Sequence, residues 1–143
     1  MAAKYDTDFY AWTQETAQAI RERRWSDLDT ENLLEEIESM GRSERRGIGS
    51  RLQLLLAHLL KRHYQPGKRT HSWDITIREQ RMQVGELFEE NPSLRAQADE
   101  LIHRAYRLAR LRAARETGIA EDVFPVTCPW SQEQVLEELA PNR

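Results

Sequence analysis

The sequence predicts an all-α protein, a helical bundle of about five main helices followed by a short C-terminal helix. The strong helix formers Ala, Glu, Lys, Leu and Arg supply 68 of the 143 residues. Valine, which favours strands, occurs only four times. Large apolar side chains recur every three or four residues, which is the repeat of an amphipathic helix. The length fits one domain, and we expect residues 1–143 to form it, with an irregular segment at about 118–130.

The first two helices are predicted near residues 7–24 and 29–40. Asp6 or Thr7 supplies a short polar side chain that caps the free amide groups at the start of the first helix. In the second helix, three apolar side chains lie on one face at spacings of four and three residues. They are Leu33, Ile37 and Met40.

Three glycines then weaken the helical signal, because each costs up to about 1 kcal/mol relative to alanine. They are Gly41, Gly47 and Gly49, and they predict a break or bend between Gly41 and Ser50, with a continuous helix as the alternative. The third helix, 50–64, carries the strongest apolar stripe and is expected to be central. Its leucines are Leu52, Leu55, Leu56 and Leu59.

Two further main helices are predicted at 72–90 and 92–117. Asn91 is expected to cap the second of these, with Pro92 in its first position and Gly118 as its stop. Small side chains and one aromatic side chain form a face that permits close helix packing. These are Ile102, Ala105, Tyr106, Ala109 and Ala113. Ser131 and Gln134 form a capping box for a short last helix that runs to Leu139.

The net charge of −3 is the sum of three blocks of different sign. Residues 1–41 carry −6, residues 42–81 carry +7 and residues 82–143 carry −4. Such blocks indicate solvated faces or helices of complementary charge lying side by side. The alternative is a basic strip that binds an anionic partner.

Composition also excludes several classes of protein. No apolar run approaches the roughly 18–20 residues of a membrane helix, and the N-terminus lacks the apolar core of a signal peptide. The single cysteine, Cys128, excludes an internal disulfide and a cysteine-rich zinc site. These features predict a soluble protein of the reducing cytoplasm.

Several stretches in a fixed order resemble a bacterial family known as domain of unknown function 29. They are Asp8–Trp12, Asp29–Glu38, Gly41–Glu44, Arg51–Leu52, His58–Lys61, Gln65–Pro66, Ser72–Trp73, Thr76–Ile77, Gln80–Arg81 and Asn91–Leu94. The resemblance covers about residues 5–136 and implies an almost wholly helical, bundle-like protein. It implies no particular activity, substrate or cofactor. The family typically has an aromatic residue where this chain has Arg62.

A basic face is the first candidate site. Arg51, His58 and Lys61 lie on one side of the 50–64 helix, and Arg81 of the next helix is placed to converge with them. A histidine beside permanent cations suits a phosphate or a carboxylate. The alternative is that these groups pair with the glutamates of the second helix, as exposed charges commonly do. Those glutamates are Glu31, Glu35, Glu36 and Glu38.

Two other chemistries have weaker support in the sequence. A pairing of Glu36 with His58 would supply a general base, but no motif supplies a nucleophile, an oxyanion hole or a phosphate loop. Di-iron bundles need two Glu-x-x-His motifs, and this chain has one, Glu100 to His103. We therefore expect no catalytic residues, no metal site and no cofactor.

The preferred functional hypothesis is a non-enzymatic interaction or regulatory module. A helical bundle with an alanine-rich face and exposed aromatic side chains can dimerise or dock a partner helix. The expected partner is therefore another protein or a second copy of the chain. An anion or nucleic-acid binder that uses the basic face, and an enzyme that uses the Glu36/His58 pair, remain the alternatives.

Overall fold

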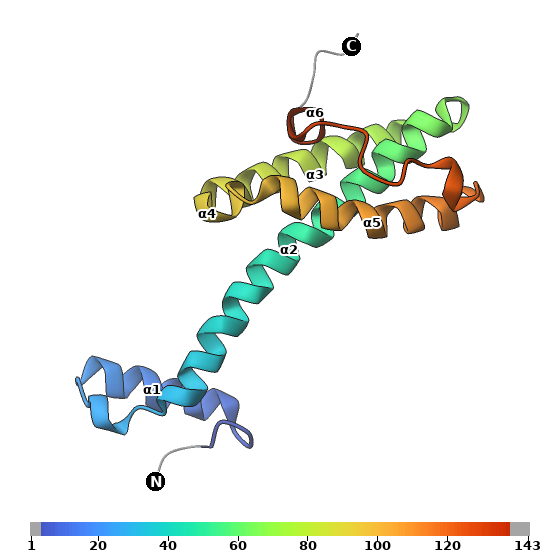
Figure 1. The fold of residues 1–143 in the computed structure, drawn as a ribbon. Coiled ribbons are helices and arrows are strands. Elements are labelled where there is room, and N and C mark those ends of the chain that lie inside the picture. The colour runs from blue at the N-terminus through green and yellow to red at the C-terminus, as the bar shows by residue number, and fades with distance from the viewer. Residues whose placement is uncertain (1–3, 138–143) are drawn as a thin grey trace. The chain divides into compact units, whose positions relative to one another are not determined.

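The computed structural model describes residues 4–137, and over that range it contains helices and no strand. The elements are α1 (Phe9–Arg21), η1 (Trp25–Asp27), α2 (Thr30–Tyr64), η2 (Pro66–Lys68), α3 (His71–Glu90), α4 (Pro92–Arg95), α5 (Ala98–Thr117), η3 (Glu121–Val123) and α6 (Gln132–Leu136) (Figure 1). The predicted all-α class is confirmed. The chain divides into a first compact unit that ends at Ser43 and a second that begins at Glu44.

The first unit contains α1, η1 and the start of α2. Asp8 caps α1 by accepting a hydrogen bond from the Ala11 amide, so the predicted cap at Asp6 or Thr7 is wrong by one or two residues. The helix also stops at Arg21 instead of continuing to residue 24. The helix ends here because Arg23 takes a left-handed conformation with φ of 57°. The next amide, of Arg24, then donates to the Ala19 carbonyl at 2.8 Å, as in a Schellman motif.

Helix α2 runs without interruption through the three glycines, so the predicted break between Gly41 and Ser50 is wrong. The segments predicted as separate helices at 29–40 and 50–64 are therefore one helix. Ile48, between two of the glycines, is fully buried, and its position continues the leucine stripe upstream by one turn. Burial of this side chain favours helical backbone where glycine propensity alone disfavours it.

The core of the second unit lies between the C-terminal part of α2, α3 and α5 (Figure 1). Leu52, Leu55 and Leu56 of α2 are fully buried, which confirms the predicted central stripe. The predicted small-residue face of α5 is also buried, from Ile102 to Ala113. The Tyr106 hydroxyl donates to the Pro125 carbonyl at 2.6 Å, which attaches the irregular segment to the core.

The remaining helix ends show which of the predicted capping and stop signals determine where a helix begins or ends. Gly118 ends α5 in a left-handed conformation, and the Ser131–Gln134 capping box is present, both as predicted. Asn91 does not cap with its side chain; its amide nitrogen donates back to the Leu87 carbonyl at 2.9 Å. The predicted 92–117 helix is divided into α4 and α5 by a turn between Arg95 and Ala98. The last helix ends at Leu136, and the predicted end at Leu139 lies outside the described residues.

Candidate functional site

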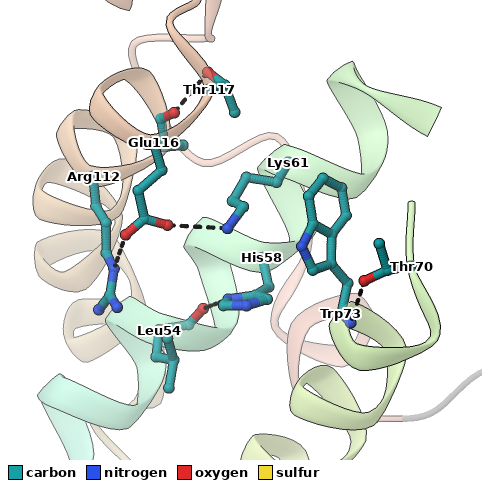
Figure 2. A network of polar contacts seen from close by, with 9 residues as sticks. Leu54, His58, Lys61, Thr70, Trp73, Arg112, Glu116 and Thr117 are labelled. Carbon is teal, nitrogen blue, oxygen red and sulfur yellow. Dashed lines mark hydrogen bonds and ion pairs between the residues drawn. The ribbon is translucent and has the colours of Figure 1, made fainter. Parts of the chain in front are cut away.

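The charged cluster between α2 and α5 contains two of the residues predicted for the basic face (Figure 2). Lys61 Nζ lies 3.0 Å from Oε1 of Glu116, and Arg112 Nε lies 3.0 Å from the second oxygen of the same carboxylate. Burial raises the pKa of Glu116, but the hydrogen bonds from Lys61 and Arg112 outweigh it and lower the pKa below its usual value. The carboxylate therefore stays charged and holds both cations.

Lys61 is further enclosed by an aromatic side chain. Its ammonium group lies 5.0 Å from the ring centroid of Trp73, and its side chain is only 12% exposed. The Trp73 backbone amide donates to Thr70 Oγ1, which caps the start of α3 next to the lysine (Figure 2). A cation over an indole face is attracted by the ring quadrupole.

His58 lies one helical turn before Lys61 and is half-buried. Its Nδ1 donates to the Leu54 carbonyl at 3.0 Å, which assigns the ring proton to that nitrogen when the imidazole is neutral. Burial lowers the pKa of His58, the bond to Leu54 opposes this, and the Lys61 charge lowers it further. At neutral pH the ring is thus uncharged and adds no positive charge to the cluster.

Arg81 is held at another place, by the end of α6. Its guanidinium donates to the carbonyls of Val135 and Gln134, each at 3.0 Å. The last carbonyls of a helix have no partner within the helix, and Arg81 satisfies two of them. This contact attaches α6 to α3.

Arg51 borders a groove on the second unit. Its Nη1 donates to the buried Gln80 side chain at 3.4 Å, and the groove beside it has a volume of about 620 Å³. The lining residues are Arg51, Ile75, Arg78, Glu79, Met82, Gln83, Glu86, Leu87 and Glu90. Three carboxylates against two guanidinium groups make this lining unsuited to an anion.

The structure thus brings His58 and Lys61 together and gives Arg51 and Arg81 separate partners. Glu36 belongs to the first unit, where it accepts a hydrogen bond from the Tyr5 hydroxyl. That bond raises the pKa of Tyr5 to about 12. Anion binding by the four basic residues and catalysis by Glu36 with His58 both stay predictions.

The carboxylates that pair with the basic segment were missed by sequence reasoning. Lys61 pairs with Glu116, Arg45 with Glu100 at 3.2 Å, and Arg62 with Asp74 at 3.4 Å. Among the predicted glutamates, Glu35 pairs with Arg42 at 3.3 Å within the first unit. The net charge of −4 over residues 82–143 indicated that this segment, which contains Glu116 and Glu100, could pair with the basic segment.

A family model described as Domain of unknown function DUF29 matches residues 4–139. The chain belongs to this family. No curated protein and no solved structure matches the chain.

Two further observations on this DUF29 chain concern membrane spans and metal sites. Between residues 4 and 137, no helix has both the length and the apolar content needed to cross a membrane. Over the same residues, no group of three or more His, Cys, Asp or Glu side chains is placed to hold a metal ion.

The first unit of this DUF29 chain presents an apolar row to solvent on α2. Leu34, Ile37 and Met40 follow one another at three-residue spacing and are 57%, 57% and 67% exposed. Glu31 and Glu38 are exposed beside Leu34 at one edge of the row, three and four residues from it along the helix. We name these five residues the acidic apolar face. The shared side of Ile37 and Met40 follows from their spacing in the sequence, but helix periodicity does not tell whether that side is covered.

Proposed function

We propose that this protein is a non-enzymatic interaction module that docks a protein partner through the acidic apolar face. The observation that carries the proposal is the exposure of Leu34, Ile37 and Met40, each more than half accessible on one side of α2. Each square ångström of apolar surface left in water forgoes about 25 cal/mol. A row of three large side chains is therefore a surface on which binding is favourable.

The spacing of the row supports a helical binding mode. Anchors three and four residues apart on one helix face are the pattern by which amphipathic helices dock into grooves or against other helices. Glu31 and Glu38 beside the row favour a partner with cations around its apolar contact, because complementary charges steer association and disfavour wrong partners. We further propose the bacterial cytoplasm as the location, where a reducing environment keeps the free thiol of Cys128 reduced.

Site-specific photo-crosslinking in living cells tests the proposal. A photoreactive amino acid at Met40 is expected to give a discrete crosslinked product, whereas the same group at Val126, which is 75% exposed on the second unit, gives none. Adding Ile37→Glu to the Met40 probe should abolish the product by placing a charge in the row. A Met40 probe that gives no product, or a product that survives Ile37→Glu, would contradict the proposal.

A further inference from the structure

We infer that the partner of the acidic apolar face is helix α5 of a second copy of this chain, so that the protein is a homodimer. The inference rests on the proposed function and names its partner. The supporting observation is a second exposed helix face, on the second unit. Its charged side chains are basic, whereas those of the acidic apolar face are acidic.

The exposed side of α5 combines leucines with arginines. Leu108 and Leu111 are 55% and 49% exposed. Three exposed arginines share their side of the helix, each four or seven residues from one of the leucines. We name this set the basic apolar face: Arg104, Arg107, Leu108, Leu111 and Arg115.

The charges of both faces are available for an intermolecular contact. Within residues 4–137, no ion pair engages Arg104, Arg107 or Arg115, and none engages Glu31 or Glu38. The neighbouring arginines of α5 differ, since Arg110 is bonded to the Phe124 carbonyl and Arg112 to Glu116. Arg110 and Arg112, which make contacts within the chain, are thus distinct from the arginines of the basic apolar face.

Complementarity favours one pairing over the others. Two acidic apolar faces brought together would oppose glutamate to glutamate, and two basic apolar faces would oppose arginine to arginine. Only acidic against basic places leucine, isoleucine and methionine against leucine while the flanking charges attract. Each copy carries both faces, and a dimer with two-fold symmetry would pair each acidic apolar face with the basic apolar face of the other copy.

Charge reversal on each face tests the inference with the full-length chain. The acidic-face variant carries Glu31→Arg and Glu38→Arg, and the basic-face variant carries Arg104→Glu and Arg107→Glu. In a homodimer of either variant, both contacts become repulsive. We expect the dissociation constant to rise by at least about 100-fold, because four exposed charge pairs change sign at once. Light scattering at low salt should then report the mass of a monomer.

The decisive measurement is the mass of a mixture of the two variants. In a heterodimer, the reversed acidic face meets the reversed basic face, and the two unaltered faces meet each other, so both contacts are attractive again. The mixture should return to dimer mass, and so should one chain that carries all four reversals. Glu89→Arg with Asp122→Arg, an equal charge change at exposed positions outside both faces, should leave the wild-type mass unchanged.

The outcomes separate this inference from the proposed function. A wild-type chain that is monomeric at low salt, or a dimer that survives either reversal, overturns the inference. So does a mixture of the two variants that stays monomeric while circular dichroism shows both variants folded. If a Met40 crosslink to a different protein persists in any of these cases, the proposed function stands without the inference. A dimer restored only in the mixture and in the fourfold variant establishes it.

Discussion

Leu56 lies in the middle of the buried stripe of α2 and has no exposed surface. Truncation to Leu56→Ala removes its packing contacts and leaves a cavity, so the free energy of unfolding should fall by about 2–5 kcal/mol. Urea unfolding measures the change, with Met82→Ala as the control because Met82 is 66% exposed. A loss below about 0.5 kcal/mol for Leu56→Ala would contradict the central place of this side chain in the core.

His58 makes the stability of the second unit depend on pH. Burial lowers its pKa below the ordinary value of 6.5 in the folded protein, so the unfolded chain binds the proton more tightly. This contribution to stability is complete above pH 6.5 and is lost as the pH falls through the lower folded pKa. In His58→Gln, the stability lost between about pH 7 and pH 5 should therefore be smaller than in the wild type. Equal losses in urea unfolding at the two pH values would contradict the prediction.

Arg23 is a non-glycine residue with positive φ, at 57°. A side chain in this region costs roughly 1–2 kcal/mol, because Cβ crowds the following carbonyl oxygen. Arg23→Gly should therefore raise the stability of the first unit by about 1 kcal/mol. Arg21→Gly is the control, since Arg21 is the last helical residue of α1 and glycine should destabilise it. Thermal unfolding, followed by fluorescence in a background that keeps Trp12 as its single tryptophan, measures both effects. An Arg23→Gly variant less stable than its parent would contradict strain at this position.

At the residue scale, sequence reasoning located the basic side chains but not their partners. The i, i+3, i+4 rule placed His58 and Lys61 on one side of a helix, and they share one cluster. It had no means of finding Glu116, which lies 55 positions after Lys61 in the sequence and meets it through packing of α5. Contacts of that range depend on how helices associate, which local periodicity does not encode.

The glycines of α2 are predicted to be replaceable at the scale of the element. At Gly41, Gly47 and Gly49, an added Cβ would meet nothing within 4 Å, and none of these residues has positive φ. Gly47→Ala should then stabilise the helix by up to about 1 kcal/mol, through propensity alone. Gly118→Ala is the matched control; it should destabilise, because Gly118 has φ of 77°. A Gly47→Ala variant that is less stable than wild type in urea would contradict this account.

Whole elements were predictable where a local signal agreed with burial. The predicted 72–90 helix matches α3 to within one residue at its start, because its apolar periodicity and its flanking polar residues point the same way. The break at Gly41–Ser50 was wrong because helix propensity is a weak term that burial of Ile48 overrides. Asn91 is the N-cap residue of α4, as predicted, but its side chain makes no capping bond because it donates to the Leu87 carbonyl, a competing bond that a sequence motif does not rank.

At the scale of the whole molecule, the single domain predicted from chain length leads to a test of cooperativity. Among residues 4–43 of the first unit, the buried apolar side chains are only Trp12 and Ala19, and a segment this short rarely folds alone. Helix α2 continues into the second unit, so we expect one cooperative transition for both. Single-tryptophan variants that retain Trp12 or Trp73 should show the same urea midpoint. A lower midpoint for Trp12 would reveal independent unfolding of the first unit.

The two hydrogen bonds from Arg81 to α6 have a consequence for the lifetime of the protein in a cell. Five residues are too few to persist as a helix in water, so α6 depends on its capping box, on the buried Val135 and on the two carbonyls that Arg81 engages. Degradation begins where a segment detaches most often. Each detachment of α6 would offer that stretch of chain to a protease, so we expect the two hydrogen bonds from Arg81 to slow degradation while the main helices remain folded.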